Sequence, residues 1–467
     1  MQTISRIDAP YGKHHVDVIR VDGYLATSCH HWRRIHLGYR ILTFSSISGK
    51  IASGLRMNSF SGFRLLFGRL RVASCILPSS LLIGAAIALF YFPTKHTHMP
   101  STESAASILY LPWYAVSYLR PRRRQNPEWT YRQAILNTYL KISLHAFTIL
   151  HIRPSLSLRH GFEGKRFVLV EPAHPVLYNG VTEDKEIKPE TIGGTWYPRP
   201  FSADPIIPDG YHVVLHLHGG SYMIGDGRSA TCRFLAKNFL TYTPSRYVFC
   251  PQYRLAGNSK CRFPAQLQDA ITAYSYLINT LRIPASRIVL SGDSSGGHLV
   301  LGLLRYIAHF DDTALLPEPK CSWLWSPWCD ILSADDRAAW IENPNYPTEY
   351  VPSFFPAWGS KHFLADLEIT ELVEEYMVPL QHPFPLPSPM LVVSGGQEVL
   401  CQEHRDLTEA LLEVPQNESS VKLYVEENVP HDILMVGWIM NFREETRRCC
   451  IKAGEFLDHL REETEKA

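Results

Sequence analysis

The sequence predicts a protein of the α/β class, in which short strand-like runs alternate with helical patterns. One run, Ile288–Ser291, leads straight into the turn Gly292-Asp-Ser-Ser-Gly296, and apolar residues at helical spacing follow it. Further strand-like runs cover residues 167–170, 212–217, 389–394 and 421–426. Open α/β sheets build their sites at the carboxyl ends of the strands, so we expect function in the turns that follow these runs.

Ser294 is the candidate nucleophile in the first of these turns. A serine hydroxyl attacks well when a strained turn lifts it out of the sheet, and flanking Cβ atoms would collide in such a turn. Gly292 and Gly296 meet this requirement on either side of Ser294. The alternative is a turn in which glycine and serine only change the direction of the chain, because five loosely specified positions recur by chance.

Composition excludes some classes of partner. The chain has 467 residues, and 46 Lys and Arg against 45 Asp and Glu give a net charge of +1. This balance gives no electrostatic reason to expect nucleic acid and favours a small neutral substrate. The ten cysteines show neither zinc-site spacing nor the density of a disulfide-stapled module, so we expect most of them to be buried thiols.

The N-terminal part is interpreted as an addition to a catalytic domain. Residues 1–71 show no repeat or sustained period and are expected to be a poorly ordered tail. Residues 72–94 contain no charged side chain and are long enough to cross a membrane as one helix. The alternatives for this segment are a buried core helix and an unusual signal peptide.

The charges that flank residues 72–94 predict the orientation of the span. Arginines are frequent before it and only Lys95 follows closely, so the positive-inside rule places the N-terminus in the cytosol. The catalytic domain would then be lumenal, in the endoplasmic reticulum, and the sequon Asn417-Glu-Ser419 would be accessible to glycosylation. A start of translation at Met99 would instead give a soluble cytoplasmic protein.

Residues 99–163 are expected to form a helical cap and linker. Ile108–Leu119 is apolar and aromatic, and four arginines follow it in residues 120–124. This order suits a membrane surface or a channel mouth, and a helix packed on the protein's own core before a solvated turn explains it equally well. A helical pattern then runs from Trp129 to Leu150.

A second glycine-rich turn follows the run at 212–217. It reads His218-Gly-Gly-Ser-Tyr222 and lies upstream of Ser294, as the oxyanion loop of lipases and esterases does. Attack on an ester puts negative charge on the carbonyl oxygen, and one donor aimed at that oxygen typically lowers the barrier by about 3–4 kcal/mol. His-Gly-Gly alone is a common turn, but its pairing with the serine turn indicates an oxyanion loop.

Together these motifs resemble the hormone-sensitive-lipase-like branch of the α/β-hydrolase fold, with its His-Gly-Gly-Gly loop and Gly-Asp-Ser-Ala-Gly-Gly elbow. Ser221 here replaces the third glycine of the loop, and Ser295 replaces the alanine after the nucleophile. The resemblance implies an oxyanion hole around Gly219, Gly220, Ser221 and Ser295, because the family's donors are backbone N–H groups that serine also has. The two hydroxyls are expected to narrow the acyl pocket.

The resemblance covers about residues 165–463 and extends to the fold. It implies a catalytic domain over residues 164–467 with a mostly parallel central sheet, helices on both faces, and a helical cap to which residues 333–375 contribute. Further matches are Gln252–Leu255, Phe263–Ala265 with Asp269, and Ser326–Asp330. Within and beside these matches, His218, Tyr253, Arg254 and Asp330 are interpreted as residues that orient loops.

A serine elbow of this type needs an acid and then a histidine further along the chain. Glu398 comes after one strand-like run, where the family usually has aspartate, and His431 comes after the next run. Glu403 and Asp406 are rival acids in a helix-like stretch, and His404 lacks a comparable placement. We therefore expect Glu398 to orient the imidazole of His431.

The sequence thus predicts a serine hydrolase that cleaves carboxylic esters of small or lipophilic molecules through an acyl-enzyme on Ser294. With the membrane span it would resemble arylacetamide deacetylases. No cofactor or metal is expected, because there is no Walker loop, dinucleotide fingerprint or His/Cys ligand spacing. An acyltransferase or hydrolase of a secondary-metabolite pathway and a non-catalytic ligand-binding relative stay open, as do the substrate and the oligomeric state.

Overall fold

The structure, a computed structural model, describes residues 19–21, 24–26, 109–202, 210–258, 260–310 and 312–466. The chain divides into two compact units, Met1–Leu77 and Pro78–Ala467. The described part of the first unit is an antiparallel pair of strands, β1 (Ile19–Val21) and β2 (Tyr24–Ala26). All further elements named below belong to the second unit.

The predicted membrane span, residues 72–94, lies outside the described residues, as does nearly all of the predicted tail over residues 1–71. Among the helices of the described ranges, none combines the length and the hydrophobicity that a bilayer crossing requires. The anchor and its lumenal orientation therefore stay predictions.

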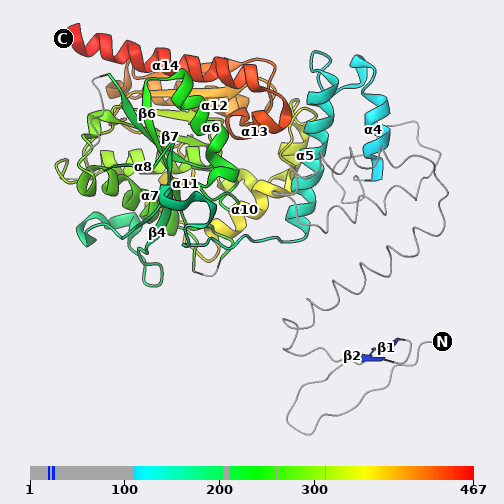
Figure 1. Ribbon diagram of the computed structural model, residues 1–467, viewed down its shortest axis with the longest axis horizontal. Helices are drawn as coiled ribbons and strands as arrows, with labels where there is room; N and C mark the ends of the chain where they lie inside the picture. The colour runs from blue at the N-terminus through cyan, green and yellow to red at the C-terminus, as the bar shows by residue number, and fades with distance from the viewer. Residues whose placement is uncertain are drawn as a thin grey trace. The chain divides into compact units, whose positions relative to one another are not determined.

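An eight-stranded sheet is the framework of the second unit (Figure 1). Its strands, in spatial order, are β10 (Val421–Glu426), β9 (Met390–Gly395), β8 (Cys321–Trp325), β7 (Ile288–Asp293), β5 (His212–Leu217), β6 (Ser245–Gln252), β4 (Ile192–Tyr197) and β3 (Phe167–Val170). Neighbours from β10 to β6 are parallel, and β4 and β3 continue the sheet antiparallel at one edge. The mostly parallel sheet that the resemblance implied is confirmed.

Helices cover both faces of this sheet. Parallel strands buried on two sides are apolar throughout, and every residue of β5, β7 and β8 is buried. Figure 1 shows α6 (Ser229–Tyr242) and α14 (Arg443–Lys466) on one side, and α7 (Ala265–Ser275) and α8 (Ser295–Ala308) on the other. Two further helices, α12 (Cys401–Glu413) and α13 (Ile433–Met440), follow β9 and β10.

A second group of helices packs beside the sheet. It consists of α4 (Leu111–Ser117), α5 (Tyr131–Ile149), α9 (Arg337–Glu342), α10 (Phe354–Leu364) and α11 (Glu371–Met377). A capping box at Thr130 starts α5. The rings of His145 and Phe147 in α5 lie against Phe354 and Trp358 of α10, with centroids 5.0 Å and 6.2 Å apart. The N-terminal helix and the later cap segment therefore pack on each other.

The aromatic segment before α5 contacts the protein's own interior. Tyr114 and Tyr118 of α4 are buried, and the Tyr118 hydroxyl shares a 3.0 Å hydrogen bond with Thr138 of α5. The Arg124 guanidinium donates to the carbonyl oxygens of Tyr118 and Trp129. Packing on the protein's own core therefore accounts for the buried side of this segment.

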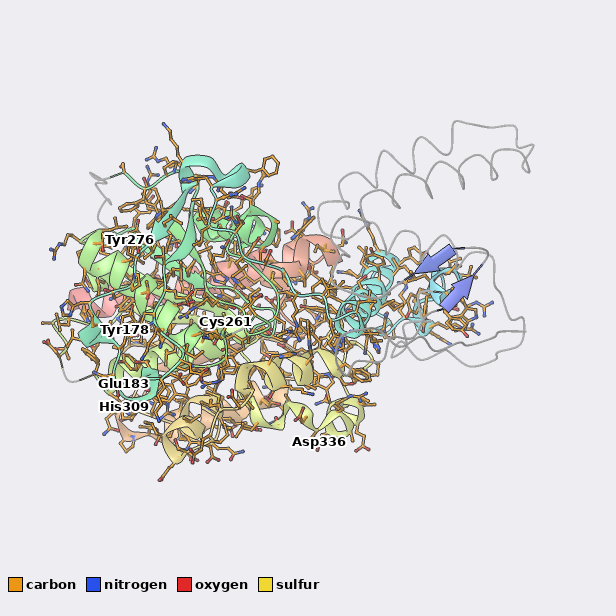
Figure 2. The ribbon with its side chains drawn as sticks, turned by 90° about the horizontal axis from the view of Figure 1, so that it is seen from below. Tyr178, Glu183, Cys261, Tyr276, His309 and Asp336 are labelled. Carbon is orange, nitrogen blue, oxygen red and sulfur yellow. The ribbon has the colours of Figure 1, made fainter. Side chains whose placement is uncertain are left out.

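The cysteines follow the expectation from composition. The eight cysteines of the described ranges carry free thiols, and all except Cys261 are buried. Cys261 is half-buried on the loop between β6 and α7 (Figure 2). The prediction that most cysteines are buried thiols is confirmed for these eight.

The expectation that the sequon at Asn417 is accessible is wrong. Asn417 is 0% exposed. Its Nδ2 donates to the carbonyl oxygens of Phe384 and Leu411, each at 2.9 Å, and its Oδ1 accepts from the Leu386 N–H at 2.7 Å. An amide committed to three protein partners is no acceptor for a glycan; it ties the segment before β9 to the end of α12.

We predict that Asn417→Ala destabilises the protein, whereas Gln416→Ala, at the exposed neighbouring position, leaves stability within about 0.5 kcal/mol. The first change leaves buried backbone groups without their partner, which should lower the free energy of unfolding by about 3 kcal/mol. Urea unfolding of both variants measures the difference. Equal stability of the two variants would contradict the role given to the amide.

Candidate active site

Ser294 lies in the turn between β7 and α8, with backbone angles φ 51° and ψ −119°. A positive φ is uncommon for serine, so the conformation is strained and is held by its surroundings. The Ser294 N–H donates to the Trp325 carbonyl oxygen at 2.8 Å. A Cβ on Gly292 would collide with the backbone of Gly296, and one on Gly296 would collide with the carbonyl oxygen of Leu217. The turn is thus the strained elbow that the motif predicted.

The structure brings Ser294, His431 and Glu398 into one hydrogen-bonded row. His431 Nε2 lies 2.9 Å from Ser294 Oγ, and His431 Nδ1 lies 2.6 Å from Glu398 Oε2. Glu398 is 0% exposed and His431 is 5% exposed. The row comes from the ends of three strands, because Ser294 follows β7, Glu398 follows β9 and His431 follows β10.

Burial and charge set the protonation of this pair. Burial alone would raise the pKa of Glu398, but the neighbouring His404 and His431 hold it below its ordinary value. Burial alone would lower the pKa of His431, but the hydrogen bond and the negative charge of Glu398 raise it. The arrangement therefore favours an ionised Glu398 that can stabilise a protonated His431.

His404 and two serines also hold Glu398, and sequence reasoning missed all three. His404 Nδ1 lies 3.6 Å from Glu398 Oε1 and 2.7 Å from Ser394 Oγ, while its Nε2 lies 2.8 Å from the Pro327 carbonyl oxygen. Ser326 Oγ donates to Glu398 Oε1 at 2.9 Å. The only signal for His404 in the sequence is its position one turn into the helix after Glu398.

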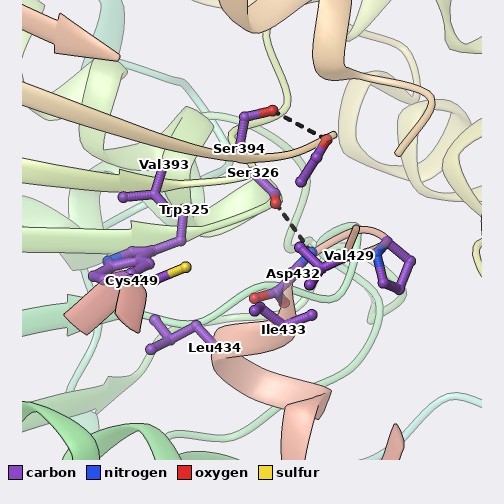
Figure 3. Close-up of a pocket in the computed structure, with 11 residues that line it drawn as sticks. Trp325, Ser326, Val393, Ser394, Val429, Asp432, Ile433, Leu434 and Cys449 are labelled. Atoms are coloured by element: carbon purple, nitrogen blue, oxygen red, sulfur yellow. Dashed lines mark hydrogen bonds between the residues drawn. The ribbon is translucent and has the colours of Figure 1, made fainter. Parts of the chain in front are cut away.

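Ser326 also connects the acid to the histidine loop. The backbone N–H of Asp432, the residue after His431, donates to Ser326 Oγ at 3.0 Å, as Figure 3 shows. A cavity of about 10 Å³ lies beside this contact, lined among others by Ser326 and Asp432. It has room for one water molecule at most, so this cavity is not where an ester would bind.

Asp293 connects the elbow to the oxyanion loop. Its Oδ1 lies 2.8 Å from Nε2 of the buried His216, and its Oδ2 accepts the Gly219 N–H at 2.9 Å. Burial would raise the pKa of Asp293, but His216 keeps it below its ordinary value. The Gly219 N–H, one of the predicted oxyanion donors, is therefore already engaged, and Gly219 has a connecting role in this arrangement.

The other three predicted oxyanion residues differ from Gly219. In the part of the chain that the structure describes, the N–H groups of Gly220, Ser221 and Ser295 donate no hydrogen bond to the protein. Ser295 Oγ accepts the N–H of Tyr222 at 3.3 Å, which joins the start of α8 to the oxyanion loop. These three N–H groups remain candidates for a ligand.

The side chain of Ser221 fits in the oxyanion loop because Gly359 of α10 lies opposite it. Ser221 has φ 50° and is 5% exposed. A Cβ on Gly359 of α10 would lie 2.8 Å from Ser221 Cβ and still closer to the Ser221 carbonyl oxygen. The side chain that replaces the family's third glycine is thus accommodated by the absence of one on the cap helix.

The four residues interpreted as loop-orienting make contacts within the protein. Tyr253 hydroxyl donates to the His218 carbonyl oxygen, and the two rings stack with centroids 4.3 Å apart. Arg254 forms a buried ion pair with Asp269 at 2.7 Å, and Asp330 accepts the N–H of a nearby serine on its own turn. The structure thus connects Tyr253 to the loop at His218, Arg254 to α7 and Asp330 to its own turn. No cluster of metal-ligating side chains occurs in the described residues.

Comparison with known proteins supports the predicted resemblance. Residues 214–435 match a family model described as alpha/beta hydrolase fold, and this range contains the elbow, the oxyanion loop and all three residues of the hydrogen-bonded row. Over this range the chain is similar to that family. The resemblance predicted from the motifs is therefore confirmed.

Three curated relatives carry related names. The chain is 28% identical over 264 residues to an acetyl-hydrolase of Streptomyces hygroscopicus, across 54% of this chain and 77% of that protein. It is 28% identical to human arylacetamide deacetylase-like 2 over 20% of this chain and 24% of that protein. It is 21% identical to steryl acetyl hydrolase 1 of Saccharomyces cerevisiae over 28% of this chain and 30% of that protein. The last two matches span less than a third of those relatives.

We predict opposite effects for two Gly→Ala changes in helices of this protein. Both remove helical glycine, which should stabilise by up to about 1 kcal/mol where space allows. Gly302→Ala in α8 meets only ordinary contacts, with Tyr376 at 3.7 Å, so the melting temperature should rise or hold. Gly359→Ala collides with Ser221 and should lower stability by about 1–3 kcal/mol.

Thermal unfolding of the two variants checks this contrast. A stabilised Gly359→Ala would contradict the close approach of α10 to the oxyanion loop.

Proposed function

We propose that the protein is a serine carboxylic ester hydrolase in which Ser294 is the nucleophile, His431 the general base and Glu398 the orienting acid. The observation that carries this proposal is the continuous row from Ser294 Oγ through the imidazole to the buried Glu398 carboxylate, with contacts of 2.9 Å and 2.6 Å. A strained nucleophile, a base within reach and an oriented acid are the geometric requirements of such a triad.

The geometry supports a two-step acyl transfer. With the Nδ1 proton donated to Glu398, the Nε2 lone pair of His431 faces the Ser294 hydroxyl. Ser294 Oγ attacks the acyl carbon as His431 takes its proton, and the alcohol leaves with that proton. Water then attacks the acyl-enzyme, again giving its proton to His431, and Ser294 regains its own as the carboxylic acid departs.

The oxyanion would be held by backbone donors of Gly220, Ser221 and Ser295. Their N–H groups lack protein acceptors in the described ranges, and Ser295 directly follows the nucleophile, as one oxyanion donor does in this fold. Gly219 would support them by fixing the loop to Asp293. Preorganised donors of this kind typically lower the barrier by several kcal/mol.

We infer that the acyl group is small, with acetyl as the first candidate. The names of the three relatives, an acetyl-hydrolase, an arylacetamide deacetylase-like protein and a steryl acetyl hydrolase, support this choice. The side chain of Ser221 also occupies space that a glycine would leave open in the oxyanion loop, against the cap helix. Family membership does not identify the alcohol part of the substrate.

Hydrolysis of p-nitrophenyl esters from acetate to long acyl chains tests the proposal on the full-length chain. We predict that acetate is cleaved with the highest kcat/KM and that Ser294→Ala lowers kcat by about a million-fold. Ser155→Ala, at an exposed serine, is the control and should retain activity. Undiminished hydrolysis by folded Ser294→Ala would exclude this nucleophile, and an inert, folded wild type would favour a pathway-specific enzyme or a ligand-binding protein.

A further inference from the structure

The segment between α9 and α10 is fastened to the loop that carries Glu398. Side chains of this segment, residues 343–349, reach the carbonyl oxygens of residues 396–399 in this loop. The contacts are Asn343 Nδ2 to Val399 O (3.1 Å), Asn345 Nδ2 to Gly396 O (3.2 Å) and Glu398 O (3.0 Å), and Thr348 Oγ1 to Gln397 O (2.8 Å). The acid loop is therefore fixed by the cap and not by the sheet alone.

Glu349 also binds this loop, but as a hydrogen-bond acceptor. It is 0% exposed, its Oε2 accepts the Val399 N–H at 3.1 Å, and its Oε1 accepts the Val351 N–H at 3.0 Å. A carboxylate buried this deeply is costly unless N–H donors and a positive charge stabilise it. Burial raises the pKa of Glu349, and the positive charge of His431 and the two backbone donors act against this rise and favour the ionised form.

His431 faces acidic groups from separate parts of the fold. The titratable groups around it are Glu398 after β9, Glu349 in the cap, Asp293 at the end of β7, its own neighbour Asp432, His404 in α12 and Tyr350, whose ring centroid is 6.1 Å away. Glu398 first, and Glu349 and Asp293 after it, raise the pKa of His431 against the effect of burial. Burial lowers the pKa of His404 and raises that of Asp432.

We propose that Glu349 is a positioning residue of the catalytic machinery, a second buried carboxylate that fixes the acid loop through Val399 and stabilises protonated His431. The inference rests on the proposed roles of His431 and Glu398. This role also explains why side chains of residues 343–349 hold the loop that carries Glu398. Glutamate at the acid position has one more rotatable bond than the family's usual aspartate, so its carboxylate needs firmer support to hold an imidazole in place.

The pH dependence of kcat/KM separates the two contributions of Glu349. For p-nitrophenyl acetate and the full-length chain, the acid limb reports the pKa of His431, which must be neutral to accept a proton. Glu349→Gln keeps the size but removes the charge, so the limb should move to lower pH by about 0.5 unit or more, and the plateau should fall about tenfold or more. Asn345→Ala removes the hydrogen bonds to Gly396 and Glu398 without changing charge. The plateau of kcat/KM should therefore fall, while the acid limb stays at the same pH.

Two further variants complete the test. Glu427→Gln removes an exposed carboxylate from the same loop as His431 and should change neither limb nor plateau. Glu349→Asp keeps the charge but shortens the reach to Val399, so it should lower the plateau and leave the limb in place. This variant also keeps the proposal testable where Glu349→Gln does not fold, because a limb moved by Glu349→Asp as far as charge removal predicts would contradict it.

If Glu349→Gln lowers the plateau of kcat/KM but leaves the acid limb at the same pH, Glu349 does not stabilise protonated His431. Its role would then be structural only, and the proposal would be overturned. NMR titration of carbon-13-labelled histidine, with His431 assigned through His431→Gln, gives the same comparison without activity. It distinguishes failure of this inference from failure of the proposed hydrolase function, because the His431 pKa should fall in Glu349→Gln even in a protein that cleaves no ester.

Discussion

The interior position of the Glu398 carboxylate is the constraint on which the rest of the site depends. A charge with no solvent contact has to be matched by donors, and here they come from every side: His431 at one oxygen, and Ser326 and the Ser394–His404 pair at the other. His431 lies in the loop after β10, Ser326 directly after β8, Ser394 in β9 and His404 in α12. Satisfying one carboxylate therefore brings these four pieces of chain into register.

The elbow depends on a different constraint, close contact of backbones. Ser294 keeps its strained φ because Gly292 and Gly296 have no side chains. The backbones of β7, the start of α8 and the end of β5 can therefore lie in close contact. Asp293 then fixes the oxyanion loop to this turn by accepting the Gly219 N–H. The candidate nucleophile and the candidate oxyanion donors are thus positioned by contacts that do not involve substrate, which is the preorganisation that acyl transfer needs.

The sequence was informative where a single local pattern carries the chemistry. Ser294 and His431 are 137 residues apart, yet each follows a recognisable strand, and parallel strands bring such turns to one edge. Three strands of the sheet, β4, β6 and β8, escaped prediction. Gly193-Gly194 interrupts the apolar pattern of β4, and Pro251 lies in β6. His404, Glu349 and Asn417 escaped because their roles depend on which face of a helix or loop turns inward, and residue spacing alone does not contain that information.

Covalent labelling at Ser294 tests the central claim, that this serine is activated by the imidazole of His431. The full-length protein would be treated with an alkyl fluorophosphonate, which reacts with serines whose hydroxyl is deprotonated by a neighbouring base, and digested for mass spectrometry. The account predicts one phosphonylated peptide, containing Ser294, formed rapidly in the wild type and far more slowly in His431→Ala. A label on another serine, or equal labelling of Ser294 without His431, would contradict it.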